Sequence, residues 1–240
     1  MMDASETHRE PRQSRSRASF ERMLIAAEQL MALKGNDDFA LTDVAKAGRV
    51  SIGSIYCRFD SKDSLVQAVQ QRVLLRLQKR QSELIARIAL ETDSLTGFVA
   101  RLVDEFSELL SEFAPILRPM MLRAARDPVV SEAGRASHGM VVADVTRAML
   151  RYRDDIAHPD PERAVQAAFN LLYAALARAL SLGSSEEAAV GVSWQQLKMD
   201  CAHMCGAFLK NAPSPNLRLQ IAEKPKKNAA AAARESPVNP

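Results

Sequence analysis

Apolar residues recur at helical spacing along almost the whole chain. The most regular stripe lies within residues 95–113 and consists of eight side chains: Leu95, Phe98, Val99, Leu102, Val103, Phe106, Leu109 and Phe113. This spacing places them on one face of an amphipathic helix. We find no convincing strand pattern, which would alternate strictly between apolar and polar residues. The sequence therefore predicts an all-α protein, and it shows no internal repeat.

Capping residues and helix breakers divide this pattern into about nine helices. The first ends near Gly35, a typical residue just past a helix end, and a long one starts after Ser61 and runs toward residue 90. Pro119 predicts a disturbed, separate short helix at 115–126. The other expected helices lie at residues 41–48, 52–59, 95–113, 129–153 (irregular near its two glycines), 160–182 and 193–210.

The predicted helices group into two folded domains between two tails. We expect a disordered basic arm at residues 1–16, a three-helix domain at 17–64, a larger helical domain at 65–210, and a disordered tail at 211–240. The chain has 240 residues and is 47% hydrophobic, which is enough for one large or two small cores.

Composition and charge narrow the class of protein. No apolar run approaches the roughly 18 residues needed to cross a bilayer, and the polar N-terminus does not match a signal peptide, so we expect a cytoplasmic protein with no membrane partner. The net charge is only +3, but positive charge gathers at residues 9–22, 46–62 and 211–240. Charge alone leaves nucleic-acid binding and simple solvated surfaces equally open.

Two short helices joined by a tight turn are predicted in residues 41–65, which read LTDVAKAGRVSIGSIYCRFDSKDSL. Ser51 is a favoured N-cap for the second helix. This arrangement is typical of a helix-turn-helix unit, whose second helix enters the major groove of DNA. Gly53 and Ser54 are small and allow close approach to a duplex. Three later side chains lie at spacings that can reach phosphates: Tyr56, Arg58 and Lys62.

Residues 21–65 resemble the TetR family of bacterial transcriptional regulators. The matching parts are RMLIAAEQLMALKG at 22–35, DVAKA at 43–47 and VSIGSIYCRFDSKDSL at 50–65. The last part is decisive, because it resembles the family pattern of Val-Ser, a small pair, Tyr, Phe after two residues, then Ser-Lys and Leu. Beyond residue 90 the resemblance is one of architecture only.

The resemblance implies roles for individual residues of the DNA-binding domain. Positions that face base edges in the family are Thr42, Ile52, Gly53 and Cys57. Positions that hold the sugar-phosphate backbone are Ser51, Ser54, Tyr56, Arg58 and Lys62. Backbone contacts fix the register of a protein on DNA, and base contacts specify the sequence. Three other residues are expected in the core of this domain: Ala45, Ile55 and Phe59.

Three residues depart from the family pattern. Arg49 stands where a turn glycine is usual, with Gly48 one place earlier, so that either the turn is reshaped or Arg49 is strained at positive φ. Ala40 replaces a Ser or Thr cap, which predicts a weakly capped first short helix. Arg58 replaces a His or Tyr and favours a stronger phosphate contact.

The larger domain is expected to hold an effector cavity, as the resemblance implies. An apolar, methionine-rich pocket is predicted among these residues: Phe98, Leu102, Phe106, Met120, Met121, Phe169 and Tyr173. The alternative is that these side chains simply form core. The helices at 160–182 and 193–210 are expected to pair with their copies in a homodimer, and intramolecular core is again the alternative.

No catalytic, metal-binding or cofactor-binding constellation is recognisable. Cys201 and Cys205 share a helix face, and His203 points elsewhere. We expect structural packing for the two thiols, with thiol sensing as the weaker alternative. We found no nucleophile, acid/base set or glycine-rich phosphate loop. We therefore expect a protein that is not an enzyme and needs no cofactor.

The prediction is a ligand-responsive transcriptional regulator. It would be a repressor that leaves a pseudo-palindromic DNA operator when a small hydrophobic effector binds. The alternative is a TetR-like DNA-binding protein without a small-molecule ligand, which would organise the nucleoid or be regulated by a partner protein.

Overall fold

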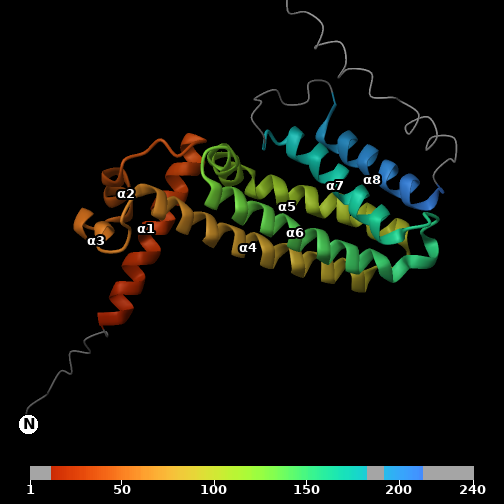
Figure 1. Ribbon diagram of the computed structural model, residues 1–240, viewed down its shortest axis with the longest axis horizontal. Helices are drawn as coiled ribbons and strands as arrows, with labels where there is room; N and C mark the ends of the chain where they lie inside the picture. The colour runs from red at the N-terminus through yellow and green to blue at the C-terminus, as the bar shows by residue number, and fades with distance from the viewer. Residues whose placement is uncertain (1–11, 183–191, 213–240) are drawn as a thin grey trace, which may run out of the picture.

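Three helices form a small head at one end of the molecule, and the remaining helices form a bundle that extends away from it (Figure 1). The computed structural model describes residues 12–182 and 192–212. Within them lie eight α-helices and one 3-10 helix: α1 (Arg12–Lys34), α2 (Leu41–Gly48), α3 (Ile52–Tyr56), α4 (Lys62–Glu91), α5 (Leu95–Ala124), α6 (Pro128–Met149), η1 (Leu150–Asp155), α7 (Pro161–Ala179) and α8 (Trp194–Lys210).

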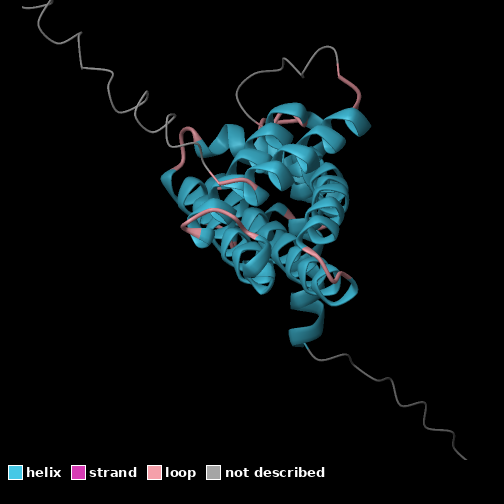
Figure 2. Cartoon of the chain, turned by 90° about the vertical axis from the view of Figure 1, so that its right-hand side faces the viewer, coloured by secondary structure: helices cyan, strands magenta, loops and turns pink. Residues whose placement is uncertain are grey.

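The described part of the chain contains helices and loops and no strand, which confirms the all-α prediction (Figure 2). Ser51, Ser94 and Asp160 each accept a hydrogen bond from the first turn of the helix that follows. These caps lie at the starts of the helices that the sequence predicted from residues 52, 95 and 160. None of the described helices is both long and apolar enough to span a membrane.

The first helix begins earlier than expected. α1 starts at Arg12, so residues 12–16 of the predicted disordered arm are helical. The rest of that arm, residues 1–11, and residues 213–240 of the predicted tail lie outside the described residues.

The separate short helix predicted at 115–126 is wrong. α5 continues through Pro115 and Pro119 to Ala124. A proline inside a helix costs about 3 kcal/mol, whereas burial of one large apolar side chain stabilises by about 1.5–3 kcal/mol. Four such side chains flank the prolines and are buried: Phe113, Ile116, Leu117 and Met120. Tertiary packing therefore outweighs the two breaks in the helix.

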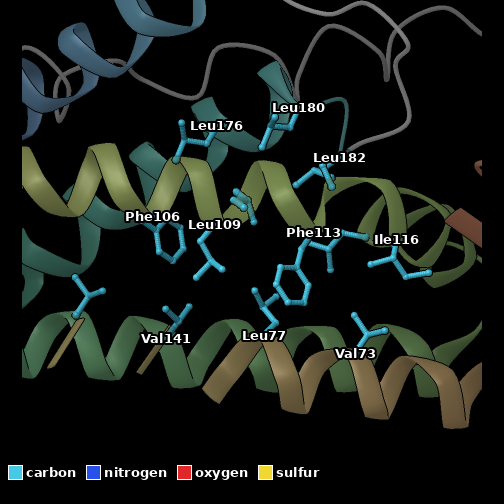
Figure 3. Packing of buried hydrophobic residues seen from close by; sticks show 14 of the residues in the cluster. Val73, Leu77, Phe106, Leu109, Phe113, Ile116, Val141, Leu176, Leu180 and Leu182 are labelled. Carbon is cyan, nitrogen blue, oxygen red and sulfur yellow. The ribbon is translucent and has the colours of Figure 1, made fainter. Parts of the chain in front are cut away.

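The core lies between α4 and α6 on one side and α5 and α7 on the other. Phe106 and Phe113 project from α5 toward Leu77 of α4 and Val141 of α6 (Figure 3). Phe106 also meets Phe169 of α7 edge to face, with 5.3 Å between the ring centroids. These contacts join four helices into one packed unit.

α4 and α6 lie side by side and run in the same direction. Gln70 Nε2 donates to the carbonyl of Val130, Ser82 Oγ donates to Asp144, and Arg151, just beyond α6, donates to the carbonyl of Ala89. The paired residues are 60 to 62 positions apart throughout. A nearly constant offset of this kind requires parallel helices. It also shows which residues of α4 and α6 lie at the same height along the bundle axis.

Candidate DNA interface and effector cavity

The short helix α3 is held in place by one cap and two buried anchors. Ser51 Oγ accepts a hydrogen bond from the backbone N–H of Ser54 at 3.1 Å. Ile55 is fully buried and Phe59 is 5% exposed, as the sequence predicted. α3 is therefore fixed against the head by one face, while its opposite face stays open.

The predicted DNA-contacting residues remain accessible on this head. Seven are exposed: Thr42, Ser51, Ile52, Gly53, Tyr56, Cys57 and Arg58. Ser54 and Lys62 are half-buried. The side chain of Tyr56 is 60% exposed although it is aromatic, which is unusual for a side chain that serves only packing.

The two predicted phosphate-binding cations are also held by contacts within the head. Arg58 lies over the ring of Phe20, 5.4 Å from its centroid, and donates to the carbonyl of Ser16 at 2.8 Å. Lys62 Nζ lies 4.8 Å from the ring centroid of Phe39. These contacts restrict the two side chains before DNA binds, which lowers the entropy cost of a phosphate contact.

The turn between α2 and α3 places its glycine where two helices meet. Arg49 adopts the left-handed conformation (φ 50°, ψ 50°), so the turn is not reshaped and Arg49 is strained. A Cβ at Gly48 would lie 3.1 Å from the carbonyl oxygen of Arg22, whose own Nε donates to the Gly48 carbonyl at 3.2 Å. α2 also lacks a side-chain cap, although Asp43 accepts from the Ala40 N–H at 3.0 Å.

Adjacent substitutions in this turn should change stability in opposite directions. Gly48→Ala should lower the free energy of unfolding by about 1–2 kcal/mol, because the new methyl group meets helix backbone that cannot shift alone. Arg49→Gly should raise it by about 0.5–1 kcal/mol, because glycine adopts positive φ without strain. Urea denaturation followed by circular dichroism measures both. A stabilising Gly48→Ala would show that α1 and α2 are not in close contact there.

A cavity of about 560 Å³ opens among α4, α5, α6 and α7. Its size suits a small organic molecule. The described residues that line it are Gln70, Leu74, Leu77, Gln81, Leu117, Met120, Met121, Ala124, Val130, Ser131, Gly134, Arg135, Ser137, His138, Gly139, Val141 and Tyr173.

The predicted pocket residues divide into two groups. Met120, Met121 and Tyr173 line the cavity. The others do not line it and are buried in the core: Phe98, Leu102, Phe106 and Phe169. The prediction selected the most regular apolar face of α5, whereas the cavity uses residues 117–124 near the end of that helix. A regular apolar face is filled by neighbouring helices, so it leaves little space for a ligand.

The polar residues of the cavity wall were missed by the sequence reasoning. Gln70 and Gln81 are each 4% exposed and interrupt the apolar stripe of α4, a signal that could have identified them. The ring of His138, which appeared isolated in the sequence, lies 4.5 Å from the ring of Tyr173, and its Nε2 lies 3.0 Å from Asn170 Oδ1. Burial raises the pKa of Tyr173, so its hydroxyl stays protonated at neutral pH.

A cluster of ion pairs joins the head to the helices of the cavity. Arg123 of α5 contacts Asp37 of the α1–α2 loop at 2.7 Å, Asp63 of α4 at 2.7 Å and Asp127, the cap of α6, at 3.0 Å. Arg126 also contacts Asp37. Burial alone would raise the pKa of Asp37, but the hydrogen bonds from Arg123 and Arg126 outweigh it and lower that pKa. We call Arg123, Arg126, Asp37, Asp63 and Asp127 the junction cluster.

The thiols of α8 are packed side chains. Cys201 and Cys205 are 6% and 8% exposed. Burial, with a smaller effect of Cys201, raises the pKa of Cys205 to about 11, so its thiol is protonated at neutral pH. A protonated, buried thiol is a poor nucleophile, which favours the packing interpretation over thiol sensing.

The helices α7 and α8, which were predicted to pair with their copies, carry apolar side chains both in the core and on the surface. Four small or apolar residues of α7 are buried within the chain: Ala164, Ala168, Leu172 and Leu176. These four belong to intramolecular core, the alternative that the sequence left open. Four large apolar side chains of the same two helices are exposed: Leu171, Met199, Met204 and Phe208.

The geometry of the head is that of a helix-turn-helix DNA-binding domain: a short, exposed helix follows a tight turn and is supported by two others. Residues 24–69 match the family described as bacterial regulatory proteins, tetR family. The match covers the head of the chain, which is therefore similar to the N-terminal domain of the TetR family. A search of the curated proteins found no significant match.

Solved structures with the same fold include several transcriptional regulators. A TetR-family transcriptional regulator from Mesorhizobium loti MAFF303099 is 21% identical, with a TM-score of 0.65 over 83% of this chain and 98% of that one. GusR from Salmonella enterica is 21% identical, with a TM-score of 0.59 over 80% and 96% of the chains. A TetR transcription regulator from Haloarcula marismortui is 16% identical, with a TM-score of 0.59 over 80% and 96%.

Proposed function

We propose that this chain is a dimeric transcriptional repressor that releases its operator when a small apolar effector enters the cavity. The observation that carries the proposal is the exposed face of α3 within a TetR-family DNA-binding domain. The proposal describes a cytoplasmic DNA-binding protein without enzymatic activity.

In this proposal α3 enters the major groove. Thr42, Ile52, Gly53 and Cys57 face base edges, and small side chains at the start of α3 let its backbone approach the duplex. The phosphates are held by Ser51, Ser54, Tyr56, Arg58 and Lys62. The exposure of Tyr56 and the prior positioning of Arg58 and Lys62 support this division of roles.

The dimer forms through α7 and α8. Leu171 of α7 and Met204 of α8 are each 65% exposed and supply apolar side chains of the kind found at the centre of protein interfaces. A two-fold dimer places two heads on successive major grooves, so the operator is a pseudo-palindrome with half-sites about one helical turn apart.

Effector binding and DNA binding are coupled through α4 and α6. Both helices line the cavity, and both begin at the junction cluster, where Asp63 and Asp127 contact the same Arg123. A ligand that separates the two helices changes the position of α4 and therefore of the head. A differential affinity of a few kcal/mol between the two arrangements is sufficient for release.

A mobility-shift assay with the intergenic DNA upstream of the gene tests the DNA-binding roles. Lys62→Ala should weaken specific binding about tenfold and reduce the slope of log affinity against log salt by about 1, because one phosphate contact is lost. Lys79→Ala is the matched control, since this lysine of α4 is 77% exposed and far along the helix from the head. Tyr56→Ala should also weaken binding. Unaltered binding by both Lys62→Ala and Tyr56→Ala would contradict the assigned roles.

A further inference from the structure

The described lining of the cavity contains no aspartate, glutamate or lysine. Arg135 is its one arginine, and that side chain is 66% exposed and paired with Glu132. The other polar groups of the described lining are amides, hydroxyls and the imidazole of His138, whose Nε2 lies 3.0 Å from Asn170 Oδ1. An ammonium group inside this cavity would lose its water without gaining a carboxylate partner, and a carboxylate would have the exposed Arg135 and the His138 ring as its described partners, so burial of either ion is unfavourable.

Two buried polar side chains of the wall have unused hydrogen-bonding capacity. Gln81 of α4 is 4% exposed and Ser137 of α6 is 8% exposed, both line the cavity, and we find no side-chain hydrogen bond from either to a described residue. On the same wall, His138 Nδ1 is a fully buried atom without a hydrogen-bond partner among the described residues. Gln70, at the other end of the lined part of α4, differs because its Nε2 already donates to the Val130 carbonyl at 2.8 Å. Native proteins pair nearly all buried polar groups, so unpaired ones that line a cavity indicate the position of a polar ligand group.

These two side chains lie close to the same level of the bundle. Because α4 and α6 are parallel with an offset of 60 to 62 residues, Ser137 is level with residues 75–77 of α4. Gln81 is therefore only about 7 Å farther along the axis, at 1.5 Å of rise per residue. Tyr173, packed on His138, brings a third polar side chain to this wall, and we find no hydrogen bond from its hydroxyl to a described residue. We call Gln81, Ser137 and Tyr173 the polar group of the cavity.

The rest of the cavity is apolar and elongated. Along α4 it extends from Gln70 to Gln81, eleven residue steps and a distance of about 16 Å. Most of the wall between these glutamines is aliphatic or thioether: Leu74, Leu77, Leu117, Met120, Met121, Val130 and Val141. Figure 3 shows Leu77 of α4 and Val141 of α6 both pointing toward α5. This wall complements an aliphatic or flat apolar body.

We propose that the effector is an uncharged, elongated apolar molecule whose hydroxyl or carbonyl group binds Gln81, Ser137 and Tyr173. The amide of Gln81 donates to and accepts from that group, while the hydroxyl groups of Ser137 and Tyr173 complete its hydrogen bonds. This inference rests on the proposed effector cavity, and it specifies the class of ligand and the residues that select it.

Three probes of equal chain length and different charge test the inference: decan-1-ol, decanoate and decylammonium. Thermal unfolding and titration calorimetry of the full chain measure binding, since a ligand that prefers the native state raises the melting temperature. Decan-1-ol should bind and raise the melting temperature, whereas the two ions should bind at least tenfold more weakly. Stabilisation by decanoate or decylammonium equal to that by the alcohol would overturn the inference.

Substitutions in the polar group of the cavity distinguish recognition of the ligand's hydroxyl or carbonyl from simple filling of the cavity by an apolar chain. Gln81→Leu should bind decan-1-ol about tenfold more weakly, the change expected for one lost hydrogen bond, while the unliganded variant melts at a higher temperature because a polar amide in a largely apolar wall is replaced by an apolar side chain. Gln71→Leu, the same change at an exposed position of α4, is the matched control and should bind normally. Ser137→Ala should weaken binding in the same direction as Gln81→Leu.

Two further outcomes would overturn this inference without affecting the DNA-binding proposal. One is unchanged affinity of Gln81→Leu for decan-1-ol. The other is the absence of binding by all three probes. In both cases the mobility shift of the wild-type chain and its loss in Lys62→Ala would still support a DNA-binding regulator.

Discussion

Replacement of Arg123 with methionine is expected to lower the free energy of unfolding by about 3 kcal/mol. The substitution keeps the aliphatic part of the side chain but removes the cation shared by Asp37 and Asp127, whose side chains are only 8% and 7% exposed. Removal of one partner from a buried ion pair typically costs about 3–5 kcal/mol, because a buried charge is left uncompensated. Arg126 remains beside Asp37, so we expect the lower end of this range.

Urea denaturation at pH 7 measures the effect, and Arg147→Met is the matched control. Arg147 is 77% exposed and pairs with Asp144 on its own helix, so its loss should change stability by less than about 0.5 kcal/mol. Equal effects of the two substitutions would mean that the junction cluster does not stabilise the fold.

The stability lost in Arg123→Met should depend on pH in a definite direction. Burial opposes ionisation of Asp37 and Asp127, but hydrogen bonds outweigh it and lower the pKa of both carboxyl groups below the ordinary value of 3.8. The donors are Arg123 and Arg126 for Asp37, and Gln67 and Arg123 for Asp127. A lowered folded-state pKa contributes stability above the unfolded-state pKa and loses it as the pH falls through the folded value. The difference between wild type and Arg123→Met should therefore be constant above about pH 5 and shrink below about pH 4.

The double substitution Leu171→Glu, Met204→Glu is expected to produce a monomer with at least about 100-fold weaker operator binding. Both side chains are 65% exposed in the single chain, and both belong to the proposed dimer face of α7 and α8. Two glutamates from each subunit would place four carboxylates in an apolar interface, at a cost of several kcal/mol. A monomer presents one head and loses the second half-site, so its affinity falls steeply.

Sedimentation velocity and the mobility-shift assay measure this effect together. Leu90→Glu is the control, because Leu90 is 81% exposed but lies near the end of α4, outside the proposed dimer face. The control should stay dimeric and bind the operator normally. A double variant that remains dimeric would place the interface on another surface.

The head was predictable because its signals are local. Ser51 as a cap and Ile55 and Phe59 as anchors all lie within nine residues, and each has the structural role that the sequence indicated. The sequence left open whether the turn is reshaped or Arg49 is strained. Only the fold decides this, because the close contact that disfavours a side chain at Gly48 comes from the carbonyl of Arg22, on another helix.

The outline of the bundle was predictable from the sequence, but two details of the prediction were wrong. The prolines at 115 and 119 indicated a separate helix, since the cost of a proline is visible in the sequence but the compensating burial around it is not. The most regular apolar stripe was assigned to the pocket, yet Phe98, Leu102 and Phe106 are close-packed core. Periodicity identifies which face of a helix is buried and does not show whether another side chain fills the space beside it.

The sequence by itself determined the all-helical class, the helix-turn-helix head and its family, because these follow from periodicity, caps and a contiguous motif. Only the tertiary structure decided the cavity and the junction cluster. Gln81 and Ser137 line the same cavity through the parallel arrangement of α4 and α6. Arg123 contacts Asp37 and Asp63 because α5 returns to the head. Contacts between residues tens of positions apart depend on the packing of whole helices, so no local pattern records them.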